Sequence, residues 1–220
     1  MSFSGLKRYN FIIRVKLAIF AKREIKKTVK ILIITYNTGK EIAEIIKKAN
    51  ASHHEIIVAA AEKQEITAPS PAIKIGSKAD RLIHRTLGYI SDSYHLHSMR
   101  ATSTLLDRIA EVRPDIIHIY TLDGDYLNLP MLAYVLMRYK IPTLLTLSNP
   151  ADIYQTRKAL IKRESHNRKL FNKILSDWEL LHIAFENREM TCHELTDPHP
   201  GYIIDPANPA SSYLEIYETI

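Results

Sequence analysis

The stretch from Arg113 to Leu147 is the part of the sequence that most constrains the fold. It contains two short apolar runs, at residues 116–120 and 143–147, which are separated by a helix-length segment at residues 127–139. Short, continuous apolar runs are typical of parallel strands that are buried on both faces. The stretch therefore predicts a strand, a loop, a covering helix and a second strand parallel to the first.

The rest of the chain alternates in the same way. Further strands are predicted at residues 29–35, 54–60, 73–75, 180–185 and 202–204, and helices at residues 41–50, 78–90, 99–112, 152–161, 170–178 and 186–195. This alternation predicts an α/β protein with a single Rossmann-like, doubly wound, mostly parallel sheet and helices on both faces.

The domain organisation follows from this pattern and from the charge. The predicted Rossmann-like domain covers residues 29–205, and residues 206–220 form a C-terminal tail for which the sequence suggests no partner in the chain. Residues 1–30 hold nine lysines and arginines and one glutamate, a net charge of +8. The whole chain carries +6, so the remaining residues carry −2 and suggest no nucleic-acid partner.

The basic segment, residues 1–28, mixes cations with apolar residues such as Phe11, Ile12 and Ile19. A helix with this composition could lie on an anionic membrane surface. The alternatives are an extension that packs on the body and a mitochondrial-type presequence. No stretch is long and apolar enough to span a bilayer, so we expect a cytoplasmic chain, membrane-associated only if this segment binds lipid.

Ligands of open α/β sheets sit outside the carboxyl ends of the strands. That rule selects the polar segments at residues 121–125 and 148–152, together with the turn that follows the first strand. The turn contains Gly39 before a predicted helix, which is an arrangement that can bind anions. One glycine makes neither a dinucleotide fingerprint nor a Walker A motif, so a simple tight turn is the favoured interpretation.

Other site types have little support in the sequence. Cys192 is the single cysteine, which excludes an internal disulfide and a cysteine-rich metal site. His95 and His97 alternate, but no third ligand is spaced to complete a metal site, so we expect no metal.

Four blocks resemble the N-terminal, acceptor-side domain of family 4 glycosyltransferases with the GT-B fold, closest to bacterial members that build surface polysaccharides. The blocks are residues 30–40 (KILIITYNTGK), 73–84 (IKIGSKADRLIH), 113–129 (RPDIIHIYTLDGDYLNL) and 140–147 (KIPTLLTL). The resemblance implies two Rossmann-like domains with a nucleotide-sugar donor bound mainly by the second. We expect this chain to lack that donor domain and to hold no cofactor of its own.

The resemblance also implies partners and site residues. A separate chain would supply the donor domain and the nucleotide sugar would be a co-substrate, while a sugar or lipid-linked sugar would be the acceptor. Asp123 is the candidate catalytic base, and the candidate acceptor- or ligand-binding residues are Asn37, Thr38, Gly39, Lys40, Gly124, Asp125, Ser148 and Asn149.

The sequence departs from the family pattern where chemistry is expected. The family's third block usually runs His-x-His-Asn-x-His-Gly, and only His118 and Gly124 match it here. His118 lies within a predicted strand, where we expect a structural role. Two alternatives to an enzyme component therefore stay open: a catalytically inactive module that binds a sugar or a partner, and a gene fragment without activity.

Overall fold

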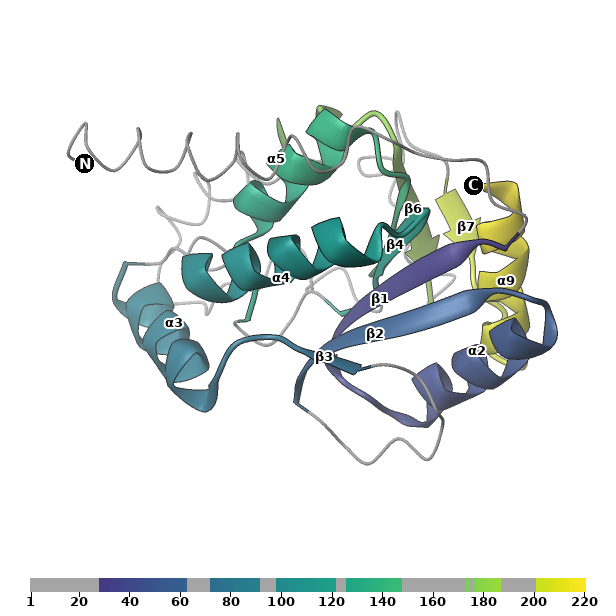
Figure 1. The fold of residues 1–220 in the computed structure, drawn as a ribbon, viewed down its shortest axis with the longest axis horizontal. Coiled ribbons are helices and arrows are strands. Elements are labelled where there is room, and N and C mark those ends of the chain that lie inside the picture. Colours follow the sequence, from purple (N-terminus) through teal and green to yellow (C-terminus); the bar gives the residue numbers. More distant parts are fainter. Residues whose placement is uncertain are drawn as a thin grey trace.

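The computed structural model describes residues 28–62, 72–91, 98–121, 126–147, 173–174, 176–186 and 201–220. Its strands are β1 (Lys30–Asn37), β2 (Glu55–Glu62), β3 (Ala72–Lys74), β4 (Ile116–Ile119), β5 (Thr143–Leu147), β6 (Leu181–Phe185) and β7 (Gly201–Ile203). Its helices are α2 (Lys40–Ala51), α3 (Lys78–Ser91), α4 (Met99–Val112), α5 (Leu129–Tyr139) and α9 (Pro209–Thr219) (Figure 1). Residues 1–27 and the helix expected at residues 152–161 lie outside the described residues, as does all but the first residue of the helix expected at residues 186–195. Of the helix expected at residues 170–178, the described residues 173, 174 and 176 are helical.

The seven strands form one sheet in the order β3-β2-β1-β4-β5-β6-β7, and every pair is parallel. Helices α2 and α9 cover one face, whereas α4 and α5 cover the other (Figure 1). The predicted Rossmann-like α/β fold is therefore confirmed. The strand order reverses direction between β1 and β4, which makes their carboxyl ends the switch point of the sheet.

The continuous apolar runs reflect this double covering. In β1, Leu32 and Ile34 belong to the core under α4 and α5, while Ile31 and Ile33 belong to the core under α2 and α9. Successive side chains point to opposite faces of a strand, so a strand covered on both faces needs an apolar residue at every position. The same rule places His118, which lies beside Ile33 in the register, on the α2/α9 face.

Helix α5 begins where its capping residue can accept a hydrogen bond. The Asn128 side chain accepts from the backbone N–H of Met131 at 3.0 Å, and Pro130 occupies the first turn. The backbone N–H of Asn128 in turn donates to Thr102 Oγ1 at 2.8 Å, which ties α5 to α4. These contacts start the helix two residues after the predicted start at residue 127.

The C-terminal tail does have a partner in the chain, so that expectation is wrong. Helix α9 packs along α2 (Figure 1), and its own Tyr213 and Tyr217 side chains are fully buried. Pro209 does not interrupt this helix because it lies in the first turn, where a proline lacks no needed N–H. Lys48 on α2 contacts Asn208 and donates to Ser211 Oγ at 2.8 Å, which fixes the start of α9.

No helix within the described ranges is long and apolar enough to cross a membrane.

Candidate functional site at the carboxyl edge

The β1–α2 turn brings four of the candidate residues to the switch point. Asn37 ends β1 with an exposed side chain, Thr38 is buried, Gly39 is the residue before the helix, and Lys40 begins α2. Asp123, Gly124, Asp125, Ser148 and Asn149 lie outside the described residues, so their roles remain predictions.

Two glutamates that the sequence did not single out meet beside this turn. The hydroxyl of Tyr120, directly after β4, lies 2.5 Å from Glu41 Oε2 and 3.2 Å from Glu186 Oε1. Glu41 is in the first turn of α2, and Glu186 follows β6 directly. We call Tyr120, Glu41 and Glu186 the rim triad. Three separate elements therefore converge on one phenol at the carboxyl edge.

The strand-end rule could have found part of this triad. Glu186 comes directly after the predicted strand at residues 180–185, in the same position as the polar residues that were selected elsewhere. The sequence pattern predicts it instead as the first residue of a helix at residues 186–195. Tyr120 is the last residue of the apolar run at residues 116–120, and Glu41 is the first residue of the helix predicted at residues 41–50.

A buried polar network lies behind the triad, under α9. His118 is fully buried; its Nδ1 lies 2.5 Å from the hydroxyl of Tyr217, and its Nε2 lies 2.7 Å from Thr146 Oγ1. Thr146 Oγ1 lies 3.2 Å from the hydroxyl of Tyr213, which donates to Glu186 Oε1 at 3.0 Å. We call His118, Thr146, Tyr213 and Tyr217 the buried relay. The expected structural role of His118 is confirmed by this burial.

Burial sets the protonation of these groups. It lowers the pKa of His118 to about 3, so the imidazole is neutral at pH 7. It also raises the pKa of Tyr213 and Tyr217 far above the usual range. Burial, with the nearby Glu41 carboxylate as hydrogen-bond partner, raises the pKa of Tyr120 as well. The three phenols therefore keep their protons and act as hydrogen-bond donors.

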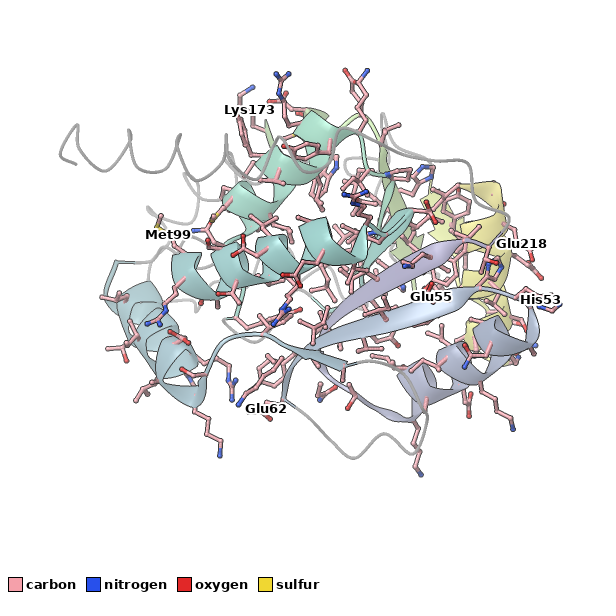
Figure 2. The ribbon with its side chains drawn as sticks, in the orientation of Figure 1. His53, Glu55, Glu62, Met99, Lys173 and Glu218 are labelled. Atoms are coloured by element: carbon pink, nitrogen blue, oxygen red, sulfur yellow. The ribbon has the colours of Figure 1, made fainter. Side chains whose placement is uncertain are left out.

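A second cluster occupies the carboxyl end of β2. Arg81 donates to Glu62 Oε1 at 3.0 Å and to the carbonyl oxygen of Ala61 at 3.0 Å, and the hydroxyl of Tyr36 donates to Glu62 at 3.2 Å. Figure 2 shows Glu62 at the far end of β2 from Glu55, which marks the carboxyl edge of the sheet. The guanidinium of Arg81 forms an ion pair with the Glu62 carboxylate. Glu186 accepts hydrogen bonds from the hydroxyl groups of Tyr120 and Tyr213.

The β1–α2 turn lacks the glycine-rich sequence that binds the pyrophosphate of a dinucleotide in Rossmann-like domains. Such a ligand needs a close backbone approach at a glycine-rich turn and the positive end of a helix. Gly39 is the one glycine of this turn. The carboxylate of Glu41 also stands in the first turn of α2, where it would repel a phosphate.

Among described residues, no group of three or more metal-binding side chains could hold an ion.

Comparison with known proteins supports no family. No family model matches the sequence, and no curated protein matches it. Solved structures share the fold distantly. UDP-glucose 4-epimerase from Brucella ovis in complex with NAD is 10% identical, with a TM-score of 0.41 over 71% of this chain and 51% of that chain.

Two further structures show the same distant likeness. A putative NAD-dependent epimerase/dehydratase from Methylobacillus flagellatus is 15% identical, with a TM-score of 0.38 over 72% of this chain and 54% of that chain. The Bordetella bronchiseptica enzyme WbmG in complex with NAD is 12% identical, with a TM-score of 0.41 over 86% of this chain and 67% of that chain. The chain thus spans about half the length of the first two structures.

None of the three structures is named a glycosyltransferase. Likeness at this level concerns the fold alone. The class that the structure defines is a Rossmann-like, parallel α/β domain with an acidic, tyrosine-bridged rim at its switch point.

Proposed function

We propose that this chain is a glycosyltransferase-like, acceptor-side domain that binds a hydroxyl-bearing sugar at the carboxyl edge of β1, β4 and β6. The observation that carries the proposal is the convergence of Glu41 and Glu186 on the hydroxyl of Tyr120. Carboxylates accept hydrogen bonds and sugar hydroxyls donate them, so a polyol suits this rim better than a phosphate.

The remaining parts of the proposal follow the resemblance. A second chain supplies the donor domain and a nucleotide sugar is the co-substrate, in the synthesis of a bacterial surface polysaccharide. Asp123 is the proposed base, and Asn37, Lys40, Asp125 and Asn149 are proposed to complete the acceptor site. The neutral phenols of Tyr120 and Tyr213 cannot serve as the base, because burial keeps their protons in place. Residues 1–28 are proposed to hold the chain at an anionic membrane, where lipid-linked acceptors are found.

The direct test is a binding panel measured by calorimetry on the full chain. The panel contains the methyl glycosides of glucose, galactose, mannose and N-acetylglucosamine, followed by UDP, UDP-glucose and NAD. We expect saturable binding of at least one methyl glycoside and no saturable binding of NAD. Saturable NAD binding with no glycoside binding would overturn the proposal.

The variants Glu186→Gln and Glu41→Gln locate the sugar. Each should weaken glycoside binding about tenfold, because a charged acceptor is replaced by a neutral amide. Glu62→Gln is the matched control, since Glu62 is also a rim glutamate but is bound by Arg81. Equal losses in all three variants would show that the sugar does not sit on the rim triad.

The alternative function is a catalytically inactive module that binds a partner protein. It is favoured by the outer side of α3, where Leu82, Ile83 and Leu87 are 67%, 57% and 42% exposed. Exposed apolar side chains that gather on one helix are typical of protein contacts. This alternative predicts that Asp123→Asn leaves the function unchanged, whereas Leu82→Ser with Ile83→Ser abolishes partner binding.

A further inference from the structure

Four hydrogen bonds connect the core under α9 to the rim of the sheet. They link Tyr217 to His118, His118 to Thr146, Thr146 to Tyr213 and Tyr213 to Glu186, at 2.5, 2.7, 3.2 and 3.0 Å. The groups come from α9, β4, β5 and the residue after β6. Hydrogen bonds that are connected in this way polarise one another, so the donor and acceptor roles at one end constrain those at the other.

The direction of each bond follows from counting protons at the rim end. A carboxylate only accepts, so the Tyr213 hydroxyl donates its single proton to Glu186. The Tyr213 oxygen must then accept from Thr146, which commits the one hydroxyl proton of Thr146. The oxygen of Thr146 is left to accept from His118 Nε2.

The same count of protons sets the direction of the hydrogen bond at the buried end of the relay. Neutral imidazole carries one N–H, and because that proton is on Nε2, the Nδ1 of His118 accepts from the hydroxyl of Tyr217. All four bonds therefore point toward Glu186. The reverse order would require a proton on Glu186 and would leave the hydroxyl of Tyr217 without an acceptor among the described residues, in a fully buried position.

We propose that His118 is a positioning residue for the rim: its Nε2–H tautomer and the orientation of the Glu186 carboxylate fix each other through Thr146 and Tyr213. The role as an aid to sugar binding rests on the function proposed above. The coupling itself concerns only the protein. Replacing a relay residue should therefore change both the tautomer of His118, far from the rim, and the acceptor presented at the rim.

Nitrogen NMR of histidine tests the tautomer without any ligand. Long-range proton–nitrogen spectra of the ¹⁵N-labelled full chain distinguish the two tautomers, and the signal lost in His118→Gln assigns the residue among the 10 histidines. We expect the wild type to hold His118 only as the Nε2–H tautomer. In Thr146→Val, which removes the acceptor at Nε2, we expect the Nδ1–H tautomer to appear.

The chain offers a matched control on the same strand. Thr143 is also fully buried in β5, but its hydroxyl donates to the carbonyl oxygen of Ile141 and takes no part in the relay. Thr143→Val should therefore leave the His118 tautomer unchanged. Tyr213→Phe interrupts the relay at α9 instead of β5, and we expect the Nδ1–H tautomer of His118 to appear in it as in Thr146→Val. Having two such variants keeps the test valid if one of them does not fold.

Binding of the methyl glycoside that binds most tightly in the panel completes the test. We expect Thr146→Val and Tyr213→Phe to weaken it about tenfold and Thr143→Val to leave it unchanged. An Nδ1–H tautomer in the wild type would overturn the coupling. Glycoside binding that survives both relay variants would overturn the positioning role alone. A wild type with the Nε2–H tautomer but no glycoside binding would contradict the proposed function and, with it, the positioning role.

Discussion

The two faces of the sheet are held by different chemistry. Under α4 and α5, the core is formed mainly by aliphatic side chains, together with the aromatic side chains of Trp178, Tyr126 and Phe185. Under α2 and α9, His118, Tyr213 and Tyr217 occupy the centre of an otherwise aliphatic core. Aliphatic packing is tolerant and nondirectional, whereas a polar network holds only while each donor has its acceptor.

This difference indicates which face of the sheet is connected by hydrogen bonds to the residues at the carboxyl edge. Loss of one contact on the α4/α5 face should cost stability in proportion to the volume removed, without consequence at the carboxyl edge. Loss of one hydrogen bond on the α2/α9 face should cost less stability but should reach Glu186. The following predictions test this contrast, from the largest expected effect to the smallest.

Acid should destabilise the α2/α9 face first. Unfolded histidine takes up a proton near pH 6.5, whereas burial lowers the pKa of folded His118 to about 3. Between these values the unfolded chain binds more protons, so the free energy of unfolding falls as the pH falls. The full difference corresponds to about 5 kcal/mol.

Urea unfolding between pH 7 and pH 4 measures this loss. The variant His118→Gln lacks the titrating group and provides the control, since the carboxylates of the chain titrate in both proteins. The wild type should lose more stability over this range than the variant. Equal slopes would show that His118 is not buried as a neutral group.

On the α4/α5 face, Leu136→Ala should lower the free energy of unfolding by about 3 kcal/mol. Leu136 is fully buried in α5, and truncation leaves a cavity lined by aliphatic neighbours. Urea unfolding at pH 7 measures the loss. The His118 tautomer should stay as it is in the wild type, and a changed tautomer would contradict the separation of the two faces.

The change Tyr217→Phe removes one hydroxyl from the opposite face and should cost about 1 to 2 kcal/mol. Its aromatic ring is kept, so the loss reports the hydrogen bond to His118 Nδ1. The measurement is urea unfolding of the variant beside Tyr139→Phe, a matched loss of a phenol on the other face, where Tyr139 packs against the aliphatic core. No loss in Tyr217→Phe would indicate that His118 has no need of this donor.

The smallest effect is expected at the start of α5. Asn128→Ala removes the side chain that caps the helix at the Met131 N–H and should cost about 1 kcal/mol. A thermal melt followed by circular dichroism detects such a loss. Asn128→Ser should restore most of it, because serine also caps helices well. A loss that serine does not restore would contradict the capping role, because the backbone N–H that donates to Thr102 is present in all three proteins.

The strands were predictable because a doubly covered sheet leaves a local signal. The run at residues 143–147 coincides with β5, and the helix at residues 99–112 coincides with α4. Helix α9 was missed because Pro209 and the two serines that follow Ala210 are usually signs of a loop, and its buried face is built partly from tyrosines. Such a helix is defined by what it packs against, which no local pattern reports.

The candidate site was predictable only in part for the same reason. The strand-end rule located the turn after β1, because the end of β1 and the start of α2 are close in the sequence. The hydrogen bond between His118 and Tyr217 joins residues that are 99 positions apart. The rim triad similarly joins three elements, and Tyr120 and Glu186 are 66 positions apart. Pairings at this distance are created by the fold itself.

The central claim is that the carboxyl edge between β1 and β6 binds a sugar on carboxylates that the polar face supports. Backbone amide NMR of the full chain, titrated with the tightest-binding methyl glycoside, tests it most directly. The account predicts saturable shifts at Glu41, Tyr120 and Glu186, with little change at Glu62. Shifts centred on Glu62 and Arg81, or none at any glycoside concentration in a folded sample, would contradict it.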